Sequence, residues 1–269
     1  MNRIYLFGLL VLFTSLNSCD MLSDSNKGGI DNTFSFEFRE FHEAENSDPI
    51  LGISIRTNEQ FPCVNYALIT SHTIKNGIIS ISINDVYISD VCLTAIGPAS
   101  TIIPLDLDAG NYGLELINGD IKDEFLINVK EEKIDITKPQ EFLENSYDFS
   151  APFNTWYRYP KNSFALVGGT FTDNTHLYEN FLVQLIDSFE VKEIYFPDDA
   201  YIPYPREGSG HYVDFPASYF TYPSEEEYNR IGNFLIEYSS KYIKSGKGVG
   251  FSLRNWRNVS YLSWLHDRE

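Results

Sequence analysis

The feature that most constrains this fold is an alternation of apolar and polar residues in the first half of the chain. Phe34, Phe36 and Phe38 alternate with polar residues, and the same spacing returns between residues 51 and 55. A period of two places every second side chain on one face of a β-strand. Since no apolar pattern of helical period interrupts residues 33–137, this part is predicted to be all-β.

Two Asn-Gly pairs divide these strands. Asn76-Gly77 and Asn118-Gly119 each lie between two strand-like apolar runs. Asn-Gly readily adopts the positive φ angles of a two-residue hairpin loop, so each pair predicts a tight antiparallel hairpin. About seven short strands in about 105 residues predict an antiparallel β-sandwich over residues 33–137.

A short motif between two of these strands sharpens the prediction. Asp108-Ala109-Gly110-Asn111-Tyr112 follows the pattern D-x-G-x-Y. It resembles the signature of immunoglobulin-like domains, in which the tyrosine hydroxyl bonds to the backbone upstream. The resemblance implies an immunoglobulin-like sandwich with Tyr112 at a corner. Leu114 stands where antibody domains carry cysteine, so a disulfide elsewhere in this region would not be the usual inter-sheet bridge.

The N-terminus has the composition of a secretory signal, with one cation before an apolar run of about ten residues. Leu16-Asn17-Ser18-Cys19 resembles the lipobox of bacterial lipoproteins, whose cysteine receives diacylglycerol and becomes the first mature residue. The resemblance implies a signal peptide over residues 1–18, an acylated Cys19 and a flexible tether up to residue 32. We therefore expect a cell-envelope protein that fatty acyl chains anchor to a membrane.

The sequence leaves two membranes open for the anchor. The outer membrane or the cell surface is favoured for this protein. In enteric lipoproteins an acid after the cysteine, here Asp20, favours the inner membrane, so that location stays open.

The remaining two cysteines form an even pair. In an exported protein, Cys63 and Cys92 are expected to form a disulfide, with two buried free thiols as the alternative. The chain has no C-x-x-C motif, so neither a thioredoxin-like site nor a zinc ribbon is expected. No metal or cofactor is predicted.

The chain is strongly acidic, and this excludes two classes of partner. It carries 20 Lys and Arg against 38 Asp and Glu, a formal net charge of −18. Phosphate binding relies on clustered cations, so nucleic acid is not an expected partner. An anionic lipid surface would repel this chain, so membrane contact is expected through the lipid anchor alone.

The second half of the chain has a different pattern. Residues 138–163 contain three prolines and are predicted to be a connector. Residues 164–269 mix strand and helix periods, with one helix starting after Asp173 or Asn174 and another capped by Ser224. The order β-α-β-β-α-β-β predicts an α+β domain of the split β-α-β, ferredoxin-like kind, with two helices on one sheet.

Residues 195–223 are rich in tyrosine and proline, and we call them the Tyr/Pro segment. Long irregular connections inside compact domains are often functional, and tyrosine offers a flat apolar face with a polar tip. Tyr201, Tyr204 and Tyr212 are predicted to contact a glycan or a protein. The alternative is a proline-stiffened loop whose tyrosines pack on their own domain.

A basic stretch follows the second predicted helix. Arg254, Trp256 and Arg257, together with three preceding lysines, lie in a stretch without acidic residues and are candidates for holding an anionic group. The alternative for the lysines is a favourable interaction with the helix dipole.

A catalytic alternative also uses the Tyr/Pro segment. His211 and Asp214, with Asp198 or His176, would make a hydrolase site if the fold brought them together. The chain lacks G-x-S-x-G and the His spacings of metalloenzymes. We therefore predict a non-catalytic binding or adhesion module for glycan or protein, with an envelope hydrolase or a structural assembly subunit as alternatives.

Overall fold

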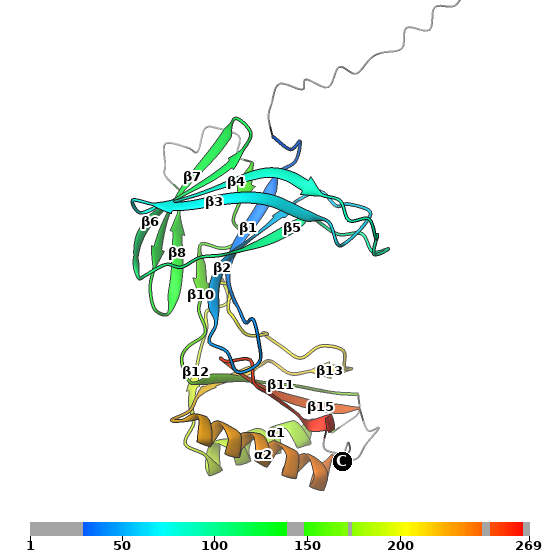
Figure 1. Cartoon of the computed structure of the whole chain (residues 1–269). Helices are drawn as coiled ribbons and strands as arrows, with labels where there is room; N and C mark the ends of the chain where they lie inside the picture. The colour runs from blue at the N-terminus through cyan, green and yellow to red at the C-terminus, as the bar shows by residue number, and fades with distance from the viewer. Residues whose placement is uncertain (1–28, 139–147, 172–173, 244–247, 266–269) are drawn as a thin grey trace, which may run out of the picture.

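The computed structural model describes residues 29–138, 148–171, 174–243 and 248–265 (Figure 1). The predicted signal peptide, Cys19 and most of the predicted tether lie outside the described residues. Within the described part, Ile30 is already bound to the fold, because its backbone N–H donates to Asn118 Oδ1 at 2.8 Å. The described chain is mostly β, as the sequence predicts.

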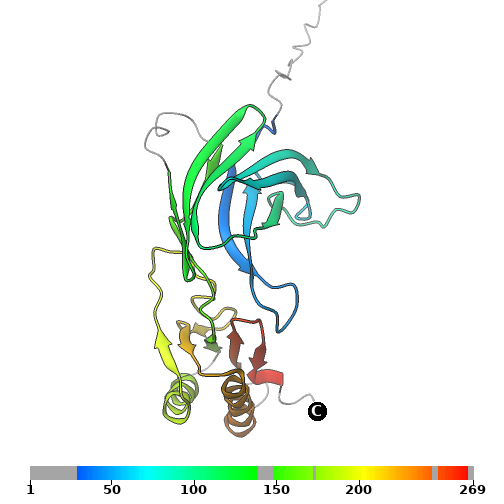
Figure 2. The ribbon, with the colours of Figure 1, turned by 60° about the vertical axis from the view of Figure 1, so that its left-hand side comes forward.

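Ten strands form one large curled sheet, seen from two sides in Figures 1 and 2. They hydrogen-bond in the order β10-β8-β7-β6-β4-β3-β5-β2-β1-β9. The strands are β1 (Phe34–Phe41), β2 (Ile50–Thr57), β3 (Ala67–Lys75), β4 (Ile78–Tyr87), β5 (Ser100–Pro104), β6 (Gly110–Asn118), β7 (Ile121–Val129), β8 (Lys133–Thr137), β9 (Phe149–Ser150) and β10 (Thr155–Tyr157).

The core of this first sheet follows from the period-two pattern. Phe34, Phe36 and Phe38 are at most 1% exposed, while the residues between them are partly exposed. Their rings pack on aromatic side chains from other strands, as Phe36 does on Phe125 and Phe38 on Trp156. Burying one face of every strand against the others makes the sheet curl around a single apolar interior.

Both Asn-Gly hairpins form. Asn76 and Gly77 have φ of 54° and 75° and join β3 to β4, while Gly119 has φ of 59° and joins β6 to β7. The Tyr112 hydroxyl donates to the Asp108 carbonyl at 3.0 Å, the upstream backbone bond that the D-x-G-x-Y motif predicts. The two hairpins nevertheless belong to one sheet rather than to the two sheets of a sandwich, because β4 pairs parallel with β6.

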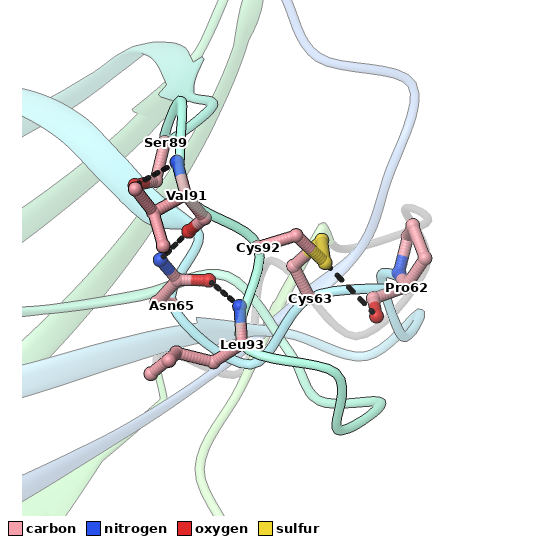
Figure 3. The surroundings of a disulfide bond; sticks show 7 residues. All are labelled: Pro62, Cys63, Asn65, Ser89, Val91, Cys92 and Leu93. Carbon is pink, nitrogen blue, oxygen red and sulfur yellow. Dashed lines mark hydrogen bonds between the residues drawn. A yellow bond between two sulfur atoms is a disulfide. The ribbon is translucent and has the colours of Figure 1, made fainter.

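The predicted disulfide is present between Cys63 and Cys92 (Figure 3). It joins the loop before β3 to the loop between β4 and β5. Asn65 fixes the second loop further, since its side chain donates to the Val91 carbonyl at 2.6 Å and accepts from the Leu93 N–H at 3.2 Å. Leu114, on β6, is fully buried, and the bridge instead joins two loops outside β6.

The second sheet hydrogen-bonds in the order β12-β14-β11-β15-β16, and β13 pairs with β11. The predicted connector contributes β9 and β10 to the first sheet and the start of β11 to the second. The elements are β11 (Ser163–Thr170), α1 (Thr175–Ser188), β12 (Lys192–Ile194), β13 (Val213–Asp214), β14 (Ser218–Thr221), α2 (Glu225–Tyr242), β15 (Val249–Asn255), β16 (Ser260–Leu262) and a short 3₁₀ turn, Ser263–Leu265.

Two helices cover one face of the second sheet, on the side away from the first sheet (Figure 1). The Ser224 hydroxyl caps α2 by accepting from the Glu227 N–H at 3.3 Å, as predicted. Asn174 is the N-cap of α1, without a side-chain cap bond. Neither described helix is long and apolar enough to cross a membrane.

The opposite face of the second sheet points toward the first sheet (Figure 1). Along β15, Gly250, Ser252 and Arg254 share this face, because Phe251 and Leu253 between them are buried against the helices. This face is where the two sheets and the Tyr/Pro segment meet.

Candidate functional site

The two sheets contact each other directly beside the end of β1. The His42 Nε2–H donates to the Trp256 carbonyl at 2.7 Å, and Asp48 pairs with Arg257 at 3.1 Å. Glu40, whose side chain is 3% exposed, accepts from the Arg158 Nε–H at 2.8 Å. The His42 and Asp48 contacts hold the β1–β2 region against the turn between β15 and β16, while Glu40 binds the chain between β10 and β11.

The Tyr/Pro segment joins both sheets. Tyr201 pairs with β10 of the first sheet, since its N–H donates to the Thr155 carbonyl at 3.0 Å and its carbonyl accepts from the Tyr157 N–H at 2.9 Å. The Tyr204 hydroxyl hydrogen-bonds the Ser163 hydroxyl at 2.8 Å, at the start of β11. The segment is therefore an ordered strap rather than an open platform.

Where this strap meets the two sheets, they enclose a groove of about 420 Å³. We call it the junction groove. Most of its lining is polar, and it receives residues from β1, from the chain before β11, from the Tyr/Pro segment and from the end of β15. Its lining consists of Arg39, Glu40, Phe41, His42, Tyr159, Tyr201, Ile202, Pro203, Tyr204, Pro205, Arg254 and Asn258.

Three tyrosines line the groove. The rings of Tyr159 and Tyr204 meet edge to face, with centroids 4.9 Å apart. Burial raises the pKa of Tyr201 and raises that of Tyr204 well above its usual value. Burial also raises the pKa of Tyr159, although the guanidinium groups of Arg254 and Arg39 act in the opposite direction. All three hydroxyls are therefore neutral hydrogen-bonding groups at physiological pH.

A polar network positions the residues from β15. The Asn255 side-chain oxygen accepts from the N–H groups of Arg257 and Val259 at 3.0 and 2.8 Å. This bonding closes the turn in which Asn258 adopts a φ of 65°, a conformation that asparagine tolerates better than most residues. Arg254, immediately before Asn255, and Asn258 are thereby fixed on the groove side of the turn.

The predicted binding residues separate into two groups. Tyr201, Tyr204 and Arg254 line the junction groove. Trp256 instead faces α2, where its indole N–H donates to Glu225 at 3.2 Å, and Arg257 pairs with Asp48. Tyr212 is 84% exposed and lies outside the groove lining.

The predicted catalytic residues also separate. His211 and Asp214 lie together, with Nδ1 and Oδ1 3.5 Å apart, over Gly169 of β11. A side chain at Gly169 would overlap both of them, which explains the glycine there. Asp198 pairs instead with Arg206 at 3.6 Å, and His176 is exposed in the first turn of α1.

The fold thus brings together one pair and no larger set of catalytic groups from that prediction. Among the described residues, no cluster of three or more His, Cys, Asp or Glu side chains is arranged to hold a metal ion.

The groove residues that sequence reasoning missed include Arg39, Glu40, His42, Tyr159 and Asn258. Arg39 occupies an ordinary outward position of a strand, and Tyr159 lies in a segment that reads as a connector. The one usable signal was Asn258, because an Asn two residues before a strand-like run favours a turn. Their convergence depends on how the two sheets pack, which no local pattern encodes.

Comparison with known proteins gives no further assignment, because no family model, no curated protein and no solved structure matches this chain.

Proposed function

We propose that this protein is a lipid-anchored, non-catalytic binding protein of the cell envelope, and that the junction groove holds a glycan. The observation that carries the proposal is the polar groove bordered by Tyr159, Tyr201 and Tyr204. A concave site with a few convergent polar groups suits a small or extended ligand better than a flat protein surface. Tyrosine rings pack on the apolar faces of sugar rings, while amides and hydroxyls bond sugar hydroxyls.

The architecture is consistent with a display role. We propose that the first sheet is a continuous variant of the immunoglobulin-like sandwich, supported by the Tyr112 corner bond. We further propose that the second sheet is of the split β-α-β, ferredoxin-like kind, supported by the order β12-β14-β11-β15 with antiparallel neighbours. The described chain begins at the end of the first sheet farthest from the helices (Figure 1). An anchor at Cys19 would then leave the second sheet pointing away from the membrane.

Alanine substitution tests glycan binding. A glycan array should give signals that Tyr201→Ala and Tyr159→Ala reduce strongly, because each removes groove lining. Tyr212→Ala is the matched control, since that ring is 84% exposed and outside the groove. Binding that survives both groove substitutions, or that depends on Tyr212, would count against the proposal.

The anchor has its own test. Intact-mass spectrometry of native protein should find a chain that begins at Cys19 and carries fatty acyl groups. Recovery of an unprocessed, lipid-free chain beginning at Met1 would refute the lipoprotein assignment without affecting the groove.

A hydrolase is the second candidate, favoured by the 3.5 Å approach of His211 to Asp214. In such an enzyme Asp214 would orient the imidazole and His211 would act as a general base toward water. His211→Gln and Asp214→Asn should then each abolish turnover of a glycan that the array identifies. Turnover that either variant retains would exclude this site.

A further inference from the structure

The arginines of the described chain divide into paired and unpaired groups. Arg158, Arg206, Arg230 and Arg257 each lie within 4.0 Å of a carboxylate. Among the described residues, Arg39, Arg56 and Arg254 have no such partner; Arg56 donates to the Ser35 hydroxyl at 3.0 Å, whereas Arg39 and Arg254 both line the junction groove. In a chain with a net charge of −18, two unpaired guanidinium groups in one groove are unexpected unless an anion belongs between them.

The acidic residues near the groove do not neutralise this pair. Glu40 lines the groove, but its carboxylate accepts from Arg158 at 2.8 Å and from the Tyr159 N–H at 2.6 Å. Glu37, two residues before Arg39 on β1, has its side chain on the same strand face. In the described structure it makes no ion pair with Arg39 within 4.0 Å. Among the lining residues, Arg39 and Arg254 outnumber Glu40, so the groove lining has a positive formal charge.

Arg39 carries a second indication of a missing acceptor. Its Nε atom is buried, and within the described part of the chain it has no hydrogen-bond partner. A buried donor without an acceptor is costly, and native structures rarely leave one unsatisfied. An acceptor that enters from the groove would remove this cost.

The two arginines reach the groove from different sheets. Arg39 comes from β1 of the first sheet and Arg254 from β15 of the second. Both line the groove together with Tyr159, and both guanidinium groups act to lower the pKa of its hydroxyl. Guanidinium groups bind carboxylate and sulfate through paired N–H donors, and the neighbouring Tyr and Asn258 side chains can bond sugar hydroxyls.

We infer that the junction groove takes a sugar residue with an anionic substituent, a carboxylate or a sulfate, and that this substituent lies between Arg39 and Arg254. The inference rests on the proposed glycan binding and narrows its ligand class. It also explains why a strongly acidic protein would keep two arginines without carboxylate partners at the meeting point of its two sheets.

Binding by the full chain to matched oligosaccharides tests this inference. The probes are uronic acid oligosaccharides, each with its carboxyl-reduced neutral form, and neutral oligosaccharides with and without sulfate. The acidic member of a pair should bind more tightly, and its affinity should fall as salt is raised. Arg39→Gln and Arg254→Gln should each weaken the acidic member about 10- to 100-fold, as expected for a lost charge-assisted bond.

Two further variants test whether the loss of affinity is specific to the guanidinium groups in the groove. Arg56→Gln removes the same charge from β2, where Arg56 donates to Ser35 at 3.0 Å outside the groove, and should leave affinity unchanged. Arg254→Lys keeps the charge but loses the planar fork, so it should retain part of the affinity. Circular dichroism of every variant checks that the fold is retained.

The outcomes distinguish recognition of an anionic substituent from glycan binding as such. Preference for either acidic class with dependence on both arginines supports the inference, and the two acidic arms tell carboxylate from sulfate. Equal binding of neutral and acidic forms through Tyr201 would overturn the inference and leave glycan binding intact. If no oligosaccharide in the panel binds, both are overturned.

Discussion

The two sheets bury different kinds of core. The buried cluster of the first sheet is built from Ile, Leu, Val, Ala, Phe and Trp side chains, and no tyrosine is among its buried described residues. The buried cluster of the second sheet includes Tyr178, Tyr222, Tyr228 and Tyr238. Each of these hydroxyls has a partner; Tyr228, for example, donates to the Val259 carbonyl at 2.9 Å and Tyr238 to the Leu177 carbonyl at 2.8 Å.

This difference separates two ways of holding a sheet together. Apolar burial in the first sheet is nondirectional, so the period-two pattern indicates which side chains form its core without requiring polar partners at fixed positions. The second sheet relies in addition on hydroxyl bonds that connect distant segments, and a buried hydroxyl requires its partner in a definite place. The stability of the first-sheet region and that of the second-sheet region should therefore respond differently to tyrosine ionisation, to loss of the disulfide and to added or removed hydroxyl groups.

The largest expected effect is that of alkaline pH, because several tyrosines act together. Burial raises the pKa of Tyr178, Tyr204, Tyr228 and Tyr238 above the usual value of about 10. Each such group stabilises the fold fully below its unfolded pKa, and that stability is lost as pH rises through its folded pKa. The second region should therefore unfold first above about pH 10.

Circular dichroism and tyrosinate absorbance together measure this effect. Both described helices lie in the second region, so the helical signal reports on it selectively. It should fall together with the appearance of tyrosinate, ahead of the β signal. Simultaneous loss of both signals would mean that the two cores unfold as one unit.

Removing the disulfide should have the next largest effect, confined to the first region. Cys63 and Cys92 are 29 residues apart, and Cys63→Ser with Cys92→Ser should lower the free energy of unfolding by about 3–4 kcal/mol. Urea titration with a β-sheet probe would measure the loss. A reductant should reproduce it in the wild-type chain and leave the double variant unchanged.

Adding a hydroxyl to the first core should cost about 2–3 kcal/mol, because nothing there is placed to bond it. Phe36→Tyr is the direct test, since Phe36 is 1% exposed and packs on Phe125 and Phe38. Chemical denaturation should find reduced stability, while ligand binding at the groove should stay unchanged. A neutral substitution would contradict the distinction between the cores.

The reverse change in the second core should have the smallest effect. Tyr228→Phe removes the bond to the Val259 carbonyl, which keeps a second donor in the Asn255 N–H at 3.0 Å. The expected loss is about 1 kcal/mol, the net contribution of one hydrogen bond. Thermal denaturation compared directly with Phe36→Tyr would measure the asymmetry between the two sites.

Local features of the fold were predictable because each has a local physical cause. Asn76-Gly77 requires only its own positive φ angles, and Ser224 caps α2 through a bond three residues away. The same holds for Tyr112, whose partner is Asp108, four residues upstream. The continuous sheet was not predictable, because the parallel pairing of β4 with β6 joins strands that no turn connects.

The site was only half predictable for a related reason. Tyr204 and Tyr212 look alike in sequence, yet one is buried beside Ser163 and the other is 84% exposed. His211 and Asp214 are close in the chain and meet, whereas His176 lies on a helix across the sheet. Arg39 reaches the groove only because the two sheets pack against each other. Composition singled out a segment that borders the groove, and tertiary packing determines which of its residues line it.

The Tyr/Pro segment also covers an edge of the first sheet. Strand β10 ends the ten-stranded order, and Tyr201 occupies its outer side by bonding to Thr155 and Tyr157. A bare edge strand is a template for pairing with another chain. A fragment cut after residue 157 would uncover this edge and should self-associate more readily than the full chain, because the second half of the chain covers an edge of the first sheet.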